Sequence, residues 1–186
     1  MARIPYADSI QCDELMRTIR LSEDTAQNNA VRLLAHAPAI GGSVLRLMHT
    51  ILVKADLDFC LRELAILRVT WRCEAQYAWV QHVTIARSIG VSDEQISALE
   101  GPDVANGPFS LREQILLAFT DEVLDGSAVS DFTFAQAREE FSFRELVELL
   151  LTIGYFRMIG PMLATLEVDP EALRLPAQPE LASQMS

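Results

Sequence analysis

Signals for the start of an α-helix recur along this chain, and they limit its fold more than any other feature. Each is a serine, followed three residues later by Glu or Gln, directly before an apolar run: Ser92 with Gln95, Ser110 with Glu113, and Ser142 with Glu145. In such a capping box the two side chains bind backbone N–H groups that the first helical turn leaves free. No pair of alternating runs surrounds an Asn-Gly hairpin turn. The sequence therefore predicts an all-α fold.

Helical patterns account for most of the 186 residues. The expected helices span residues 9–19, 43–55, 58–71, 74–89, 93–100, 111–124, 131–140 and 143–166, with one more that Ser22 caps and that ends before Pro38. We expect the last helix to kink or break at Gly160-Pro161, because proline has no N–H and its ring clashes with the preceding turn. The length fits a single domain, which we place over residues 1–168, followed by a loosely held tail over residues 169–186.

The composition favours association of several copies of the chain. Apolar residues make up 50% of the sequence, and the mean hydropathy is slightly positive. A domain of this size cannot hide so much apolar surface internally, so we expect a homo-oligomer that buries it between subunits. The net charge of −11 argues against nucleic acids and anionic membrane surfaces as partners.

The spacing of cysteine and histidine predicts neither a disulfide framework nor a metal site. The cysteines are Cys12, Cys60 and Cys73, an odd number without patterned spacing. The histidines, which are His36, His49 and His82, fall on separate expected helices without an i, i+4 pair. No phosphate-binding loop and no nucleophile elbow is present. We expect no metal and no cofactor.

Two segments of the chain bear on its localisation. The N-terminal residues lack the long apolar core of a signal peptide. The apolar stretch over residues 146–166 contains Glu148, Arg157 and Pro161, so we expect a buried helix and not a membrane span. On this basis the protein is expected to be cytoplasmic.

The candidate chemistry lies on two consecutive expected helices. Glu63 lies on the first, and His82 on the second, where Ala75 and Ala78 precede it at helical spacing. A tight turn near Arg72 would bring Glu63 back toward His82. A histidine beside a carboxylate can transfer protons near neutral pH.

A structural interpretation competes with this one. A single histidine on a helix with one glutamate upstream is common and is usually not catalytic. Glu63 could be the third residue of a capping box that begins at Cys60. The alanines near His82 could pack against another helix instead of leaving space beside the imidazole.

The block from Arg62 to Glu94 resembles the carboxymuconolactone decarboxylase family, which includes the AhpD-like alkylhydroperoxidases. It reads Arg-Glu-Leu-Ala-Ile-Leu-Arg, then Tyr77-x-Trp79-x-x-His82, then Ala86-x-x-x-Gly-Val-Ser-Asp-Glu. The redox branch of that family carries Glu, then Cys twelve residues on, Cys three further and His four further. From Glu63, these positions hold Ala75, Ala78 and His82. The resemblance extends over roughly residues 38–166.

The resemblance implies an AhpD-like helical protomer built around a core helical hairpin, which assembles into trimers or hexamers. Because both redox cysteines are alanine, it implies acid–base chemistry on a small carboxylated, lactone-like molecule, by decarboxylation or double-bond isomerisation. His82 would then carry the proton and Glu63 would orient it. Arg68 or Arg72 would clamp a carboxylate of the substrate, and Tyr77 and Trp79 would shape the pocket.

Two other functions stay open. Cys73 lies near the first expected cysteine position and could act as a lone peroxidase thiol, with peroxiredoxin-like activity and a small thiol as its resolving partner. Alternatively, the chain could form a helical oligomer that binds a small molecule without catalysis.

Overall fold

The computed structural model describes residues 2–19, 28–102, 104–126 and 128–171. Within them every regular element is a helix and none is a strand, which confirms the all-α prediction. The helices are, in order, α1 (Ser9–Ile19), α3 (Asn29–Leu34), α4 (Pro38–Lys54), α5 (Phe59–Arg72), α6 (Gln76–Ser88), α7 (Asp93–Leu99), α8 (Leu111–Asp125), α9 (Asp131–Glu140) and α10 (Phe143–Thr165). The helix start that we expected at Ser22 lies outside the described residues; within them, α3 begins at Asn29 with Asn28 as its N-cap.

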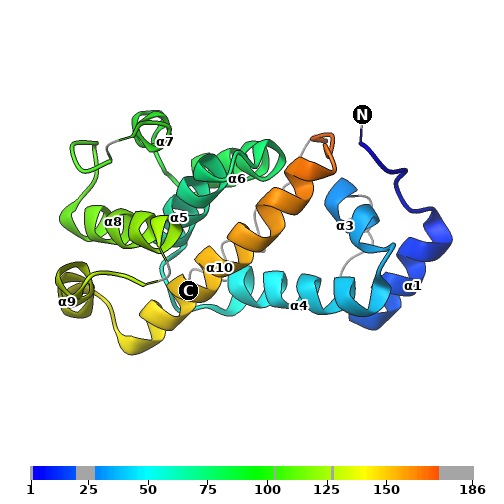
Figure 1. The fold of residues 1–186 in the computed structure, drawn as a ribbon, viewed down its shortest axis with the longest axis horizontal. Coiled ribbons are helices and arrows are strands. Elements are labelled where there is room, and N and C mark those ends of the chain that lie inside the picture. The colour runs from blue at the N-terminus through cyan, green and yellow to red at the C-terminus, as the bar shows by residue number, and fades with distance from the viewer. Residues whose placement is uncertain (1, 20–27, 103, 127, 172–186) are drawn as a thin grey trace.

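Helix α5 is the centre of the molecule. It packs against α6, α7, α8 and α10, and every residue from Leu61 to Thr70 is buried. A helix that is buried on all sides belongs to the core and not to the surface. Figure 1 shows α10 crossing the molecule diagonally, with α1, α3 and α4 toward one end and α7, α8 and α9 toward the other.

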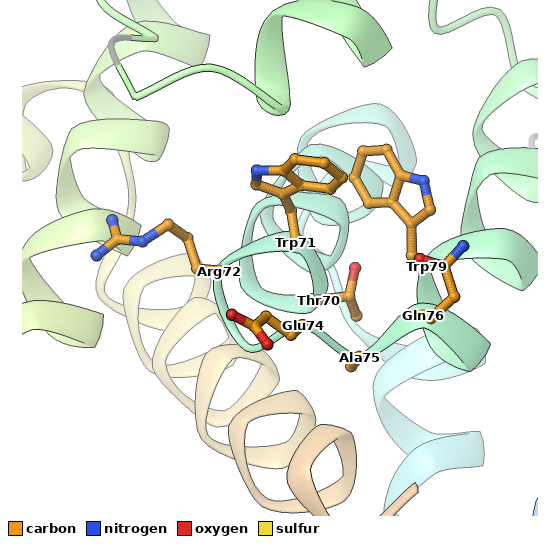
Figure 2. A pocket seen from close by; sticks show the side chains of 7 residues that line it. All are labelled: Thr70, Trp71, Arg72, Glu74, Ala75, Gln76 and Trp79. Atoms are coloured by element: carbon orange, nitrogen blue, oxygen red, sulfur yellow. The ribbon is translucent and has the colours of Figure 1, made fainter. Parts of the chain in front are cut away.

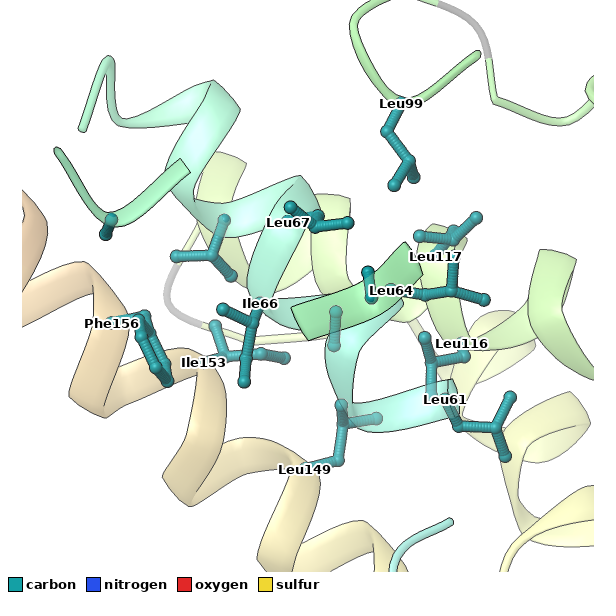
Figure 3. Close-up of a cluster of buried hydrophobic side chains, with 14 of the residues drawn as sticks. Leu61, Leu64, Ile66, Leu67, Leu99, Leu116, Leu117, Leu149, Ile153 and Phe156 are labelled. Atoms are coloured by element: carbon teal, nitrogen blue, oxygen red, sulfur yellow. The ribbon is translucent and has the colours of Figure 1, made fainter. Parts of the chain in front are cut away.

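The core consists of leucine and isoleucine side chains that converge on α5. Leu64, Ile66 and Leu67 of α5 meet Leu116 of α8 and Ile153 of α10 in one apolar cluster (Figure 3). Each such side chain stabilises the fold by about 1.5–3 kcal/mol when it is fully buried. This packing determines how α5 sits against its neighbours and so determines where Glu63 points.

The capping boxes form as predicted. Ser92, Ser110 and Ser142 each accept a backbone hydrogen bond from the third residue of the helix, whose side chain binds back. Helix α5 differs, because Asp58 is its N-cap and accepts from the N–H groups of Cys60 and Leu61. Glu63 is therefore not part of a capping box.

The structure differs from the prediction at the start of α4 and at the expected break in α10. Helix α4 begins at Pro38 and not at residue 43. It runs through Gly41, where a Cβ would lie 2.5 Å from the carbonyl oxygen of Leu34, so glycine here permits the close approach of α3. Of the kink or break that we expected at Gly160-Pro161, the break is absent. Helix α10 continues to Thr165 because buried residues on both sides of Pro161, among them Ile159 and Leu163, hold it in place.

The beginning of the expected tail is anchored. The backbone N–H of Asp169 donates to the hydroxyl of Tyr6, and the side chain of Asn29 donates to the carbonyl of Asp169. Glu171 accepts a hydrogen bond from Tyr77. A loosely held segment therefore does not begin at residue 169, and residues 172–186 lie outside the described part.

Helix α10 is long and apolar enough to cross a membrane by length and composition alone. Half of its most apolar window is buried inside the protein, against α4, α5, α6 and α8. A half-buried apolar helix of this kind is typical of the core of a soluble protein.

Candidate active site

Glu63 and His82 meet inside the protein, as we predicted from the helix order. Glu63 Oε2 lies 2.7 Å from His82 Nδ1. The two residues are only 1% and 7% exposed, so the contact is shielded from bulk water. A buried carboxylate and imidazole at hydrogen-bonding distance form a possible proton-transfer pair.

A short turn between α5 and α6 creates this contact. Cys73 is the C-cap that follows α5, Glu74 has a left-handed φ of +53°, and Ala75 precedes α6. The N–H of Ala75 donates to the carbonyl of Thr70 over 2.8 Å, which closes the turn. The two helices therefore form a hairpin, and α5 presents Glu63 to α6.

The surroundings of the pair are apolar on one side and charged on the other. The ring of Phe156 on α10 meets the imidazole edge to face, with centroids 4.9 Å apart. Beside Glu63, the guanidinium of Arg62 donates to the carbonyl of Ile51 over 3.2 Å. Burial lowers the pKa of Arg62, against the opposing effect of the Glu63 charge. Since Nδ1 of His82 is engaged by Glu63, Nε2 is the nitrogen available for chemistry.

The two alanines at the redox-cysteine positions are buried beside this pair. Ala75 is on the N-terminal side of α6, and a Cβ added to Gly160 of α10 would lie 2.9 Å from its methyl group. Ala78 is one turn before His82 on the same helix. On one side of Ala75, α10 therefore packs closely against the start of α6.

Both predicted carboxylate clamps have other partners. Arg68 is 1% exposed and binds Asp121 through Nε and Nη2 at 2.7 and 2.8 Å. Its Nη1 donates to the carbonyls of Leu99 and Gly101. Arg68 thus joins α5, α7 and α8, and it has no exposed face for a substrate. This is a correction, because the sequence did not show which carboxylate would pair with it.

Arg72 is similarly occupied, although it lies closer to the surface. It binds Asp121 over 2.9 Å and also pairs with Asp125. Burial alone would lower the pKa of Arg72, but the hydrogen bonds and charges of these two carboxylates outweigh it and raise the pKa. A substrate carboxylate would have to displace Asp121 or Asp125 to bind here.

The hydroxyl of Tyr77 has partners other than Glu63 and His82. Its hydroxyl lies 2.8 Å from Asn28 Oδ1 and 2.6 Å from Glu171 Oε1. Burial and the neighbouring Glu171 raise the pKa of this phenol well above its usual value. Tyr77 therefore holds α6 to the residue before α3 and to the C-terminal segment.

Trp79 lines a cavity together with residues of the α5–α6 turn (Figure 2). The cavity has a volume of about 440 Å³, and it is lined by Thr70, Trp71, Arg72, Glu74, Ala75, Gln76 and Trp79. The two indole rings contact each other, with centroids 5.2 Å apart and planes 54° apart. His82 and Glu63 are not part of the lining. Neither Trp71 nor Glu74 was predicted to line a site; the available signal for Trp71 is a large aromatic residue at the end of the helix expected over residues 58–71.

The thiols are not activated. Cys73 is the C-cap of α5, where burial raises its pKa despite the opposing charges of Arg157 and Arg72. Burial also raises the pKa of Cys60, whose Sγ contacts the carbonyl of Ile89. Among the described residues, no three His, Cys, Asp or Glu side chains are placed to hold a metal ion.

Comparisons with known proteins extend these observations. The Carboxymuconolactone decarboxylase family matches residues 38–125. A search of the curated proteins found no match.

Solved structures share the fold at low sequence identity. A peroxidase-related protein with an alkylhydroperoxidase AhpD core, from Ralstonia eutropha JMP134, has a TM-score of 0.79 and 19% identity, with 91% of this chain and 92% of that chain covered. A peroxidase-related protein from Silicibacter sp. TM1040 has a TM-score of 0.76 and 16% identity, with 91% of each chain covered. The debrominase Bmp8 has a TM-score of 0.70 and 13% identity, with 90% of this chain and 91% of that chain covered. A Bmp8 variant was also solved with 2,3,4-tribromopyrrole.

The matched segment spans α4 to α8 and so includes the hairpin that joins Glu63 to His82. The structural likeness covers 91% of this chain. Residues 38–125 therefore match the carboxymuconolactone decarboxylase family, and the fold of the chain is AhpD-like.

Proposed function

We propose that this protein is an acid–base enzyme that acts on a small, lactone-like molecule by decarboxylation or double-bond isomerisation, without a cofactor. The buried contact between Glu63 and His82 carries the proposal. It combines a group that exchanges protons near neutral pH with a carboxylate that orients it and balances its charge.

The chemistry assigns each group a role. Loss of carbon dioxide breaks the bond between the carboxylate carbon and the ring, and the electron pair enters the unsaturated lactone. The imidazolium form of His82 then donates its Nε2 proton to a ring carbon and becomes neutral. Isomerisation would use the same nitrogen to remove a proton from one carbon and return it to another. Glu63 keeps the second proton on Nδ1 throughout.

Neither arginine that we expected to bind a substrate carboxylate is free to do so. Arg68 and Arg72 are both bound to Asp121. Substrate orientation would therefore depend on shape and on the apolar edge of Phe156 more than on an arginine clamp. Since the debrominase Bmp8 was solved with tribromopyrrole, a small ring is a ligand that the fold has been seen to hold.

The experiment is carbon dioxide release from 4-carboxymuconolactone, measured for the wild type beside His82→Ala and Cys73→Ser. We expect release by the wild type and by Cys73→Ser, and none by His82→Ala. Isomerised lactone without release of carbon dioxide, again lost in His82→Ala, would support the isomerase form of the proposal. Turnover that survives His82→Ala would overturn it.

The two alternatives have weaker support. A peroxidase that uses Cys73 would need a thiolate, whereas burial raises the pKa of this thiol. Peroxide-dependent sulfenic acid at Cys73 in the wild type would favour it. A binding oligomer without catalysis would be favoured if substitutions at His82 and Glu63 left every measured ligand affinity unchanged.

We also propose that the protein works in the cytoplasm as a homo-oligomer, a trimer or hexamer. The outer face of α10 carries Phe143, Val147, Leu150, Leu151 and Met158, all exposed in one subunit. Leu151→Arg should reduce the mass measured by sedimentation, while Thr84→Arg on the exposed side of α6 should leave it unchanged. A wild-type protein that sediments as a monomer would exclude the oligomer.

A further inference from the structure

The cavity at the α5–α6 turn is lined by residues other than the Glu63–His82 pair. Its lining comes from the last turn of α5, the turn itself and the first turn of α6. Its volume of about 440 Å³ is within the range of small-molecule sites. Neither Glu63 nor His82 lines the cavity, so a ligand bound there need not be the substrate of the proposed reaction.

Glu74 occupies a backbone position that usually takes glycine. Its φ is +53°, and the turn has the hydrogen bonds of a Schellman motif, from Glu74 N–H to the Trp71 carbonyl at 3.0 Å and from Ala75 N–H to the Thr70 carbonyl at 2.8 Å. A side chain is strained in this conformation. Strain that persists in a cavity wall is a reason to look for function there.

Two other helices of this protein end in the same motif and show what is unusual about Glu74. Helix α6 ends with Gly90 at φ +98°, the residue that the motif prefers. Helix α10 ends with Glu167 at φ +51°, and the carboxylate of Glu167 pairs with Arg3 over 2.8 Å. Glu74 has neither the glycine backbone nor a partner, because its carboxylate makes no hydrogen bond or ion pair within the described residues.

The remaining charges around the cavity are balanced. Arg72, the only other charged residue of the lining, is bound by Asp121 and Asp125. Arg68, behind it, also binds Asp121. Among the charged residues that line the cavity, Glu74 is therefore the one without an ion-pair partner in the described part of the chain; Arg157, whose charge acts on Cys73, is outside the lining.

Two tryptophans supply the apolar part of the wall. Trp71 is 37% exposed, and its ring lies beside that of Trp79 (Figure 2). Figure 2 shows the two indoles next to each other, with Glu74 and Ala75 of the turn apart from them and Gln76, the first residue of α6, beside Trp79. The face of an indole ring attracts cations and disfavours anions.

We propose that this cavity binds a small organic cation of the quaternary ammonium class, with its methyl groups on the face of Trp71 or Trp79 and its charge balanced by Glu74. The site is distinct from the Glu63–His82 pair and selects the opposite charge from a carboxylated lactone. It gives the protein a second ligand, either an effector or a cationic part of a larger substrate.

The test compares three probes of nearly the same shape and different charge: choline, 3,3-dimethylbutan-1-ol and 3,3-dimethylbutanoate. Isothermal titration at low salt should give the tightest binding for choline and the weakest for the carboxylate. Trp71→Leu should weaken choline binding about fivefold. Glu74→Gln should weaken it about threefold, the size expected for an exposed ion pair.

A control variant shows whether choline responds to the carboxylate of Glu74 or to the net charge of the protein. Glu94→Gln removes one negative charge from α7, outside the cavity, and should leave choline affinity unchanged. Glu74→Gly relieves the backbone strain while removing the carboxylate, so it should unfold at a higher temperature than the wild type and yet bind choline more weakly. The proposal would be overturned if choline did not bind detectably, or if the neutral alcohol bound as tightly as choline or the carboxylate bound more tightly. It would also be overturned if Glu74→Gln and Glu94→Gln changed the affinity for choline equally.

Discussion

Glu63 holds His82 through Nδ1, with 2.7 Å between the carboxylate oxygen and the ring nitrogen. An ionised carboxylate only accepts hydrogen bonds, so Nδ1 carries a proton in this contact. The neutral imidazole then has its lone pair on Nε2, and the charged imidazolium has its transferable proton there. In the proposed reaction the two nitrogens therefore have different tasks, one to position the ring and one to exchange protons.

The first prediction concerns catalysis by this pair. His82→Ala should lower kcat for the lactone by on the order of 10²–10⁴-fold, because the transferable proton is lost. Glu63→Gln should lower it by on the order of 10²-fold, since the amide still accepts the Nδ1 proton but does not balance the charge of the imidazolium. Steady-state kinetics measures both. An unchanged KM in Glu63→Gln would separate this effect from substrate binding, and an unchanged kcat would exclude the role of Glu63.

The second prediction concerns Arg68, which the structure makes a stabilising residue. Arg68→Ala leaves Asp121 without its bidentate partner and leaves the carbonyls of Leu99 and Gly101 without a donor. The free energy of unfolding should fall by about 3–5 kcal/mol, as for other broken buried pairs. Urea denaturation measures it. The control is Arg87→Ala, which breaks an exposed pair with Asp93 and should cost about 0–1 kcal/mol. Equal losses in the two variants would contradict this role.

Features that depend on neighbours in the sequence could be predicted from the sequence. The capping boxes at Ser92, Ser110 and Ser142 form because each needs only a serine and a side chain three residues on. The Glu63–His82 contact could be anticipated because a short turn joins two helices whose apolar faces must meet.

Features that depend on distant partners could not. Arg68 pairs with Asp121, which is 53 residues away in the sequence, and nothing in the spacing identifies that carboxylate. The same holds for Tyr77, whose hydroxyl meets Asn28 and Glu171. Local rules predicted a break at Pro161, but the packing of α10 against α5 and α6 outweighed them.

The third prediction tests the close approach of α10 to the start of α6. Gly160→Ala would place a methyl group 2.9 Å from Ala75 Cβ, nearer than side chains pack. The free energy of unfolding should fall by about 1–3 kcal/mol, the usual cost of overpacking. Adding Ala75→Gly should recover part of that loss, because it removes the clashing methyl group. Thermal and urea unfolding of the single and double variants measure the coupling, and strictly additive effects would contradict the contact.

The fourth prediction is a pH dependence that originates at Glu145. Burial acts to raise the pKa of Glu145, but the N–H and hydroxyl of Ser142 and the charge of Arg112 outweigh it and lower the pKa. A carboxyl group whose pKa is lowered on folding stabilises the protein above its unfolded pKa of about 4.3 and loses this contribution as the pH falls through the folded value. Glu145→Gln should therefore be less stable than the wild type at neutral pH, and the difference should shrink as the pH falls below about 5. Urea denaturation across this range measures the two stability curves. Curves that stay parallel into acid would show that Glu145 does not cause the effect, because the other carboxylates titrate equally in both proteins.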